Sequence, residues 1–279
     1  MIKPVLQDNA FLEDVSHAKS EPNKLHLWWL GQSGFLVQYL DHHLLIDPYL
    51  SDSLTKKYVG TNKPHVRMTE RVIAPERLDF VEVVTSSHNH TDHLDGETLV
   101  PLLRANLTLT VLVPRANIHF AAERLQVPVE KLTPIRVDDE AITINPFTFY
   151  AIPSAHETLE QDENGDYRCM GLVVQVGKWT IYHSGDCIPY DGLADRLKPW
   201  KIDLALLPIN GRDPRRGVAG NFSAEEAAQL GTEINAGRVI PCHYEMFEFN
   251  TVSPQEFVQA AEQIGQKYHL LKCGERLDL

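Results

Sequence analysis

The chain is poor in cysteine and has no long apolar run. Its four cysteines, Cys169, Cys187, Cys242 and Cys273, form no CxxC pair, which excludes a zinc ribbon and favours a reducing compartment. No stretch approaches the roughly 18 consecutive apolar residues of a membrane span, and the N-terminal segment lacks the basic and then apolar layout of a signal peptide. We therefore expect a cytoplasmic protein with no membrane partner.

Basic residues are also in the minority. Lysine and arginine together number 26, against 38 aspartate and glutamate residues, so the formal net charge is −12. This balance argues against a general nucleic-acid binder, because neutralising phosphates drives that kind of binding. It leaves open a small anionic substrate held by a local basic cluster. The 43% hydrophobic and 23% charged residues are ordinary for a globular protein, which excludes disordered and collagen-like classes.

The pattern of apolar runs predicts two sheets with helices outside. Near the N-terminus, short β-rich runs separated by turn residues indicate a β-meander, and strands alternate with helices further on. The predicted strands span 25–30, 34–39, 44–46, 81–85, 108–113, 141–144, 147–152, 171–176, 180–183, 204–207, 239–241 and 269–271. The predicted helices span 98–105, 114–125, 193–197, 224–234 and 254–264, with Ser223 and Glu226 forming a capping box before 224–234. This order is typical of two packed sheets covered by helices.

Two segments fall outside that alternation. Residues 1–22 are expected to form an N-terminal appendage with a short helix capped by Asp8, and residues 23–279 to form one domain. The stretch 51–77 has weak periodicity and several charges. It is too long for an ordinary connection, and such loops often cover a site or bind ligands.

The most informative segment is 85–95, TSSHNHTDHLD, which directly follows a predicted buried strand. Imidazole and carboxylate groups are the usual ligands of zinc and similar metals. His88 and His90 are two residues apart in an extended or tightly turned loop, so that both rings can face one ion. Asp92 and His93 follow one turn later and can face a second ion.

Three further candidates lie later in the chain. His156, Asp186 and His243 each come shortly after the end of a predicted strand. The carboxyl ends of strands are where the functional loops of such sheets converge. Together with the segment 85–95, these residues predict a two-metal site bridged by a carboxylate.

The succession of H-x-H-x-D-H, a lone histidine, Gly-Asp and a late histidine resembles the metallo-β-lactamase superfamily, over roughly residues 25–279. More narrowly, the chain is similar to the branch that contains L-ascorbate-6-phosphate lactonase and, more distantly, N-acylphosphatidylethanolamine-hydrolysing phospholipase D. The segments that carry this similarity are WWLGQSGF at 28–35, IDPYLSDS at 46–53, LPING at 207–211 and PCHYEMF at 241–247. The resemblance implies an α+β fold, a four-layer αββα sandwich with metals in a groove at one edge of the two sheets.

The resemblance also implies a role for each histidine and aspartate. The implied ligands of a first metal are His88, His90 and His156. Those of a second metal are Asp92, His93 and His243, and Asp186 is implied as the carboxylate that bridges the two metals. Asp47 matches an aspartate that supports ligand histidines from behind, since a ligating histidine usually donates its other N–H to a carboxylate or carbonyl. The expected cofactor is one or two divalent transition-metal ions, with zinc and manganese as the candidates.

The activity implied by the resemblance is hydrolysis. A metal-activated hydroxide attacks a small ester or lactone, with phosphorylated, sugar-like molecules among the candidates, and Asp92 is the candidate catalytic residue that orients the nucleophile or relays its proton. Two alternatives stay open: a phosphodiesterase acting on a nucleotide or lipid headgroup, and a non-hydrolytic metal-binding or redox protein. The redox alternative is disfavoured, because the flavodiiron-type motif has a glutamate where this chain has an aspartate.

Contacts to the substrate are expected from two loops. Gln32 lies in a loop that approaches the site in relatives. The segment 211–217, GRDPRRG, is a basic island that follows a predicted strand, and the planar fork of arginine suits anionic groups such as phosphate. The candidate substrate contacts are Gln32, Asn210, Arg212, Arg215 and Arg216. The expected partner is a small anionic molecule, and a homo-oligomer is also compatible with the sequence.

Overall fold

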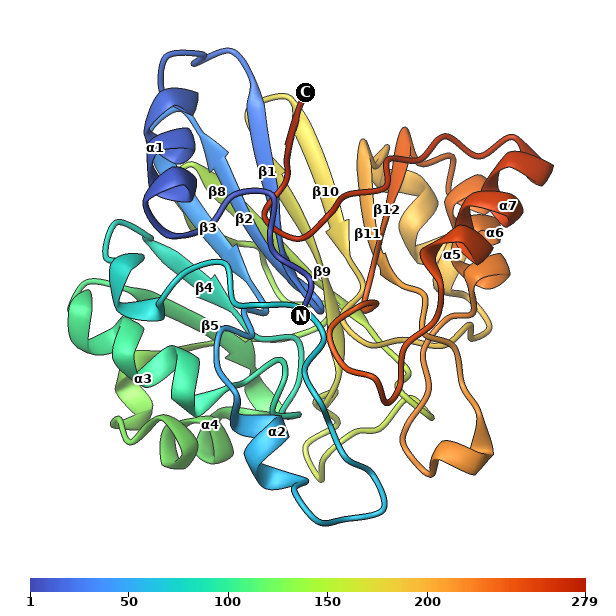
Figure 1. Cartoon of the computed structure of the whole chain (residues 1–279), viewed down its shortest axis with the longest axis horizontal. Coiled ribbons are helices and arrows are strands. Elements are labelled where there is room, and N and C mark those ends of the chain that lie inside the picture. The colour runs from blue at the N-terminus through green and yellow to red at the C-terminus, as the bar shows by residue number, and fades with distance from the viewer.

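Two mixed β-sheets form the centre of the structure, a computed structural model that describes residues 1–279 (Figure 1). The first sheet has seven strands in the order β13-β1-β2-β3-β4-β5-β6. They are β1 (Leu25–Gly31), β2 (Gly34–Tyr39), β3 (His42–Ile46), β4 (Val83–Thr85), β5 (Thr110–Pro114), β6 (Leu132–Ile135) and β13 (Arg276–Asp278). The second sheet has six strands in the order β12-β11-β10-β9-β8-β7. They are β7 (Ile142–Ile144), β8 (Phe147–Pro153), β9 (Met170–Val176), β10 (Trp179–His183), β11 (Leu204–Pro208) and β12 (Arg238–Cys242).

Helices cover the outer faces of both sheets. Beside the first sheet, α4 contacts β5 and β6 and also packs against α3, whereas α6 packs on β11 and β12 of the second sheet and α7 packs on α6 (Figure 1). The seven α-helices are α1 (Asp8–Ala18), α2 (Ser53–Lys57), α3 (Gly96–Ala105), α4 (Ile118–Leu125), α5 (Leu193–Leu197), α6 (Ala224–Glu233) and α7 (Pro254–Ile264). The structure therefore confirms the four-layer αββα sandwich. None of these helices has the length and apolarity that spanning a bilayer requires.

Each sheet changes from antiparallel to parallel pairing along its width. In the first sheet β13, β1, β2 and β3 pair antiparallel, and β3, β4, β5 and β6 pair parallel. In the second sheet β7 to β10 pair antiparallel, and β10, β11 and β12 pair parallel. Because parallel neighbours end at the same side, the carboxyl ends of β3 and β4, and of β10, β11 and β12, each collect at one edge. β8 runs in the same direction as β10, so it ends at that edge too.

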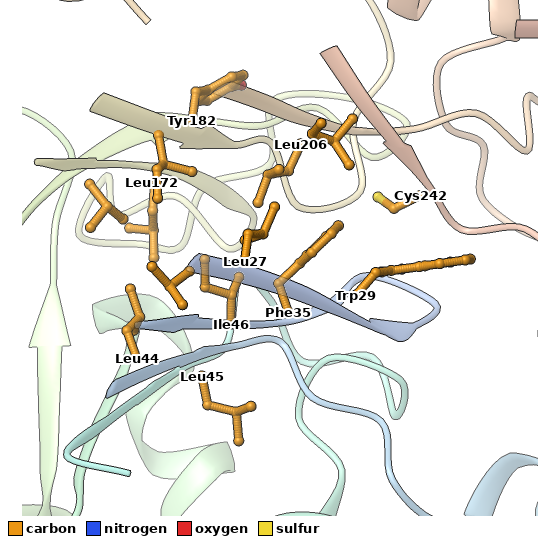
Figure 2. Packing of buried hydrophobic residues seen from close by; sticks show 14 of the residues in the cluster. Leu27, Trp29, Phe35, Leu44, Leu45, Ile46, Leu172, Tyr182, Leu206 and Cys242 are labelled. Atoms are coloured by element: carbon orange, nitrogen blue, oxygen red, sulfur yellow. The ribbon is translucent and has the colours of Figure 1, made fainter. Parts of the chain in front are cut away.

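The main core lies between the two sheets. Figure 2 shows Leu27 and Phe35 of the first sheet on the side that faces Leu172 and Leu206 of the second, with Leu45 on the opposite face of the first sheet. All of these side chains belong to one cluster of 69 buried hydrophobic residues. A core of this size stabilises the sheets without help from the loops at their edges, since burying apolar surface contributes roughly 25 cal/mol per Å².

The N-terminal helix α1 belongs to the same core. Phe11 and Val15 are buried, and the Phe11 ring meets the Trp28 ring edge-on at 6.2 Å between centroids. The Trp28 indole N–H donates to Asp14 Oδ2 at 2.8 Å. Strand β1 is therefore buried along its whole length. The division of the chain at residue 22 stays a prediction.

Several predicted helix boundaries are corrected by the structure. Asp8 was expected to cap α1, but Gln7 occupies the cap position and Asp8 lies in the first turn. Pro114 was expected to begin a helix; it instead ends β5, and α4 begins at Ile118 after a 3₁₀ turn. At α6 the prediction is confirmed, because the Ser223 hydroxyl accepts from the Glu226 N–H and the Glu226 carboxylate accepts from the Ser223 N–H.

The strand predictions fail at two sheet edges. The segment 269–271 was expected to be the last strand, but it forms no strand, and only the neighbouring Tyr268 makes an isolated bridge to Val239. The last strand is β13, which pairs with β1. Strand β6, which the sequence pattern missed, contains a proline at position 134 and pairs with β5 only. Both are short edge strands without a clear local apolar pattern: β13 pairs with the distant β1, and β6 pairs with the preceding strand β5.

We expect Phe11→Ala to lower the free energy of unfolding by about 3–5 kcal/mol, because it removes a fully buried ring and leaves a cavity. Urea unfolding followed by circular dichroism measures this. The exposed Glu13→Ala on the same helix is the control and should change stability by less than about 0.5 kcal/mol. Equal stability of the two variants would show that α1 is not part of the core.

Candidate metal centre

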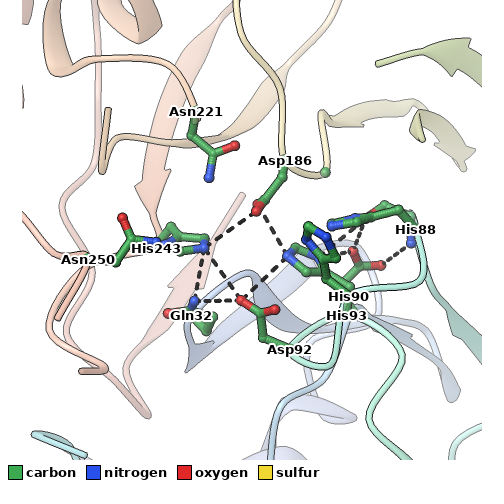
Figure 3. A network of polar contacts seen from close by, with 12 residues as sticks. Gln32, His88, His90, Asp92, His93, Asp186, Asn221, His243 and Asn250 are labelled. Atoms are coloured by element: carbon green, nitrogen blue, oxygen red, sulfur yellow. Dashed lines mark hydrogen bonds and ion pairs between the residues drawn. The ribbon is translucent and has the colours of Figure 1, made fainter. Parts of the chain in front are cut away.

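The side chains predicted to bind metal come from strand ends at one edge of the sandwich. His88, His156 and Asp186 each lie three residues beyond a strand, namely β4, β8 and β10, and His243 follows β12 directly. Asp92 and His93 lie further along the loop that begins after β4. Figure 3 shows that side chains from both sheets meet there. The topology therefore brings together residues that are up to 155 positions apart (243 − 88).

The first group consists of His88, His90 and His156, whose candidate ligand atoms all lie within 4.8 Å of one another. His90 Nδ1 and His156 Nε2 are 3.1 Å apart. The buried His88 Nε2 has no hydrogen-bond partner. A divalent transition metal prefers such a set of imidazole nitrogens, and burying an unpaired polar atom is otherwise unfavourable. The three side chains therefore fit a metal ion.

The second group consists of Asp92, His93, Asp186 and His243, whose candidate ligand atoms also lie within 4.8 Å of one another. His93 Nε2 is 3.2 Å from Asp186 Oδ1, and His243 Nε2 is 3.6 Å from both Asp186 Oδ2 and Asp92 Oδ2. Asp186 Oδ2 also lies 3.5 Å from His156 Nε2 of the first group. Asp186 thus stands between the two groups, the position that a bridging carboxylate would take.

Asp47 holds the centre from behind. It is fully buried, and its Oδ2 accepts from His93 Nδ1 at 2.7 Å. The Ser87 N–H donates to Asp47 Oδ1 at 3.0 Å, and the Ser87 hydroxyl donates to Oδ2. Because His93 Nδ1 carries the proton in this arrangement, its Nε2 is left to face Asp186. This is the support that a ligating histidine usually receives.

His156 is oriented in the same way by the backbone. Its Nδ1 donates to the Gly220 carbonyl at 2.9 Å, which leaves Nε2 directed at His90 and Asp186.

Gly185 is needed for the close packing of its loop against Ser87. Its φ is +58°, and a Cβ at this position would lie 2.6 Å from Ser87 Cβ. A side chain at residue 185 would therefore collide with the residue that links Asp47 to the histidines.

The charges of the centre are strongly coupled. Burial lowers the pKa of His88 and of His90. At His243 burial also opposes the charge, but the carboxylates of Asp186 and Asp92 together outweigh it and raise the pKa to about 9. Burial likewise opposes the charge of Asp186, but His93 and His243 outweigh it and hold its pKa well below the usual range. The carboxylates thus favour positive charge in the centre, which a bound metal ion would supply.

Three residues of the site adopt a left-handed backbone conformation. Gln32, Asp47 and His243 have φ values of +50°, +38° and +64°, and such conformations cost non-glycine residues about 1–3 kcal/mol each. The His243 N–H donates to the Gln32 carbonyl at 2.9 Å. The Gln32 side chain donates to Asp92 Oδ2 at 2.8 Å and lies 2.9 Å from His243 Nε2. Strain of this kind persists where the surroundings over-determine it, and it clusters at functional sites.

A pocket of about 340 Å³ opens over the two groups. The lining residues are Gln32, Leu54, Lys57, Tyr58, Lys63, His65, His90, Thr91, Asp92, His156, Glu157, Asp186, Gly217, Val218, Ala219, His243, Phe247 and Asn250. The stretch 51–77, expected to be a lid or binding loop, supplies five of them. A larger open groove of about 700 Å³ between α5, α6 and α7 has no histidine or cysteine in its lining, so the smaller pocket is the candidate active site.

The predicted substrate contacts are only partly brought to this pocket. Gln32 lines it, whereas Asn210 and the three arginines do not. Arg212 forms a two-pronged pair with Glu226, both at 2.6 Å, and Arg215 pairs with Asp213 at 2.8 Å. Two of the three arginines of the basic island are thus paired with carboxylates, one inside the island and one outside it. The role of the island in binding substrate stays a prediction.

Arg216 and Asn210 do not line the pocket, but both contact a residue that does. Arg216 donates to the Asn210 carbonyl at 2.8 Å and to Asn250 Oδ1 at 2.9 Å. The Asn210 side-chain amide also donates to Asn250 Oδ1, at 3.1 Å. Asn250 lines the pocket, so these two residues fix a lining side chain. The sequence pattern missed Asn250 and the lysines Lys57 and Lys63, because none of them lies in a motif.

Comparison with known proteins identifies the superfamily. Residues 42–244, most of the chain, match the family model described as the beta-lactamase superfamily domain, so the chain belongs to that superfamily. A relative from Caldivirga maquilingensis, named a metal-dependent hydrolase, is 25% identical over 256 residues, which cover 91% of this chain and 98% of the relative.

Solved structures agree on the fold. A possible metal-dependent hydrolase from Veillonella parvula superposes with a TM-score of 0.73 at 15% identity, covering 91% of this chain and 99% of the other. Igni18, a metallo hydrolase from Ignicoccus hospitalis, superposes with a TM-score of 0.67 at 18% identity, covering 92% and 98%. Both superpositions span nearly the whole of this chain.

We expect Asp47→Asn to weaken metal binding about 10–100-fold, because residue 47 would no longer hold the His93 ring with a charged acceptor. Asparagine tolerates the left-handed backbone at this position, so the fold should persist. Competition with a chelator of known affinity measures the change. Asp41→Asn, which removes an exposed carboxylate paired with Lys19, should leave metal affinity unaltered. Unchanged affinity in Asp47→Asn would contradict the role given to Asp47.

Proposed function

We propose that the protein is a metal-dependent hydrolase that holds one or two divalent transition-metal ions, zinc or manganese, and cleaves a small ester or lactone. The observation that carries the proposal is the convergence of seven donor side chains from two sheets at one edge of the sandwich, where five of them line one pocket. The names of the relatives support a hydrolase. The similarity of four sequence segments to the ascorbate-phosphate lactonase branch supports a lactone or ester.

The residues divide into two binding positions. His88, His90 and His156 would hold one ion, Asp92, His93 and His243 would hold the other, and Asp186 would bridge them. When bound, such ions supply a water acidic enough to attack at neutral pH and a positive charge that stabilises the developing oxyanion. The buried Nε2 of His88, which has no hydrogen-bond partner, is the observation within the centre that supports this assignment.

Asp92 and Gln32 have separate tasks in the proposal. Asp92 is 14% exposed in its side chain, and among the carboxylates of the centre it is the one more open to the pocket. Burial opposes its charge, but the neighbouring His93 and His243 lower its pKa. The carboxylate therefore stays ionised, and in the proposal it accepts a hydrogen bond from the attacking water and orients it. Gln32, which donates to Asp92, orients that carboxylate and keeps one of its oxygens occupied.

The pocket supports a small polar substrate. Its volume of about 340 Å³ lies at the lower end of the roughly 300–1,000 Å³ of small-molecule sites. Most of its lining residues are polar, and the hydrophobic ones are Leu54, Tyr58, Val218, Ala219 and Phe247. A long lipid chain would need a more apolar groove. These features favour an ester or lactone of a compact molecule over a lipid substrate.

Metal analysis of the purified protein should find about one or two transition-metal ions per chain, in keeping with two adjacent groups of ligands. Chelation should abolish hydrolysis of a simple lactone or aryl ester, and zinc or manganese should restore it. The same chelator added together with an excess of metal is the control. Full activity in a preparation shown to be free of metal would rule out the proposed mechanism.

His90→Ala and Asp186→Asn should each reduce kcat by at least about a thousandfold, since each removes a ligand that orients the reacting centre. Both positions lie in loops beyond the core strands, so the melting temperature should change little. His119→Ala, which alters an exposed histidine on α4, should keep full activity. Wild-type turnover in both ligand variants, with metal content unchanged, would show that the ligands are assigned wrongly.

A further inference from the structure

We propose that Lys57 and Lys63 bind an anionic group, a carboxylate or a phosphate, at the end of the substrate remote from the metal centre. The inference rests on the proposed function and gives its substrate a chemical class. Both lysines line the pocket. They come from α2 and the loop that follows it, within the long segment 51–77 that covers the site.

Neither lysine is neutralised by an acid. Lys57 Nζ lies 3.5 Å from the Thr91 hydroxyl and over the Tyr58 ring, 5.2 Å from its centroid. Lys63 Nζ donates to the Gly217 carbonyl. By contrast, the adjacent Lys56 pairs with Glu97 at 2.6 Å and takes no part in the pocket lining. Two cations thus remain available for a ligand, while their neighbour has a partner.

The position of Lys57 relates it directly to the centre. Thr91, its hydroxyl contact, stands between His90 and Asp92 in the chain, and all three line the same pocket. Lys63 contacts the Gly217 carbonyl, and residues 217–219 line the same pocket. Both lysines thus line the same pocket as Asp92 and Asp186, as an anion-binding group for the remote end of a substrate requires.

Aromatic packing holds this lysine-bearing loop in place. The His65 ring stacks on Tyr58 at 4.4 Å and meets Phe247 edge-on at 5.1 Å. The Thr55 hydroxyl donates to the His65 carbonyl at 2.6 Å, and His65 Nδ1 donates to the Lys63 carbonyl at 2.8 Å. The backbone that carries the two lysines is therefore fixed between α2 and the 247 region, and less ordering is needed when an anion binds.

The other charges of the pocket set the orientation of the ligand. Asp92 and Asp186 lie at the floor among the histidines. Glu157 is exposed and also lines a second pocket of about 280 Å³, to which the lysines do not contribute. Negative charge is thus at the floor and on the Glu157 side, and positive charge is on the lysine side. In a chain of net charge −12, such a local cation pair is what allows an anionic molecule to approach.

The test uses three sugar acids that share one end and differ at the other. Gluconate, glucarate and 6-phosphogluconate have the same carboxylate and hydroxyl chain, but carry a hydroxyl, a carboxylate or a phosphate at carbon 6. Each is titrated by calorimetry into the metal-loaded protein and into its Lys57→Gln, Lys63→Gln and Lys56→Gln variants. The measurement needs no turnover, so it is independent of whether the protein hydrolyses lactones.

We expect the wild-type protein to bind 6-phosphogluconate or glucarate about tenfold more tightly than gluconate, the gain of one charge-assisted contact. The tighter of the two identifies phosphate or carboxylate as the group recognised. Lys57→Gln and Lys63→Gln should each remove most of that gain and leave gluconate affinity unchanged, and Lys56→Gln should match the wild type.

Three results would overturn the inference: equal affinity for gluconate, glucarate and 6-phosphogluconate, equal losses for all three ligands in the Lys57 and Lys63 variants, or no loss in either variant. Failure of the proposed function has a different signature, namely lysine-dependent anion binding by a protein that hydrolyses no lactone or ester with its metal in place.

Discussion

Strands from two separate sheets end at one edge of the sandwich, and every feature of the site follows from that arrangement. β4 supplies His88, β8 supplies His156, β10 supplies Asp186 and β12 supplies His243, each within three residues of the strand end. Loops this short leave little freedom, so the positions of the side chains are inherited from the sheets. The sheets are fixed in turn by the large core between them, which is built from residues that have no part in the chemistry.

Bringing so many polar side chains together at one edge is accompanied by unfavourable backbone conformations and by buried polar atoms without partners. Gln32, Asp47 and His243 hold left-handed conformations, and several buried nitrogen and oxygen atoms of the centre lack partners. Each is unfavourable on its own. Metal ions bound by the two groups would give these atoms partners. Such ions would also account for the contacts of Asp47 and Ser87 with the histidine Nδ1 atoms, which leave the Nε2 atoms directed into the centre. These features lower the stability of the folded state at the site, and the buried core and metal binding raise it.

Sequence reasoning succeeds where the information is local. The apolar runs predicted most of the strands, and the capping box of α6 lay within four residues, Ser223 to Glu226. The histidines and aspartates could be listed because each follows a strand signal. It fails where partners are distant in the chain: β13 pairs with β1 across the whole sequence. The island arginine Arg212 is paired with Glu226, a residue 14 positions away that is itself placed by a helix cap.

Lys57 and Lys63 are a second example of residues whose role the sequence alone does not reveal. Nothing in a run of surface lysines marks which of them faces a site, because Lys56 and Lys57 are neighbours in sequence but point to different partners. The direction is set by α2 and by the aromatic contacts of His65 with Tyr58 and Phe247. Loops that bear binding residues on a rigid scaffold vary more than the scaffold does, so the grouping of the histidines and aspartates was easier to predict than the other residues that line the pocket.

The central claim is that the two groups of side chains form one metal centre at the floor of the pocket. Anomalous diffraction from crystals of the metal-loaded protein, recorded on both sides of the absorption edge of the metal, tests it most directly. The account predicts an anomalous peak among His88, His90 and His156, among Asp92, His93 and His243, or at both positions, with Asp186 beside each peak. An anomalous peak only elsewhere on the molecule, with both groups empty in a crystal shown to contain the metal, would contradict it.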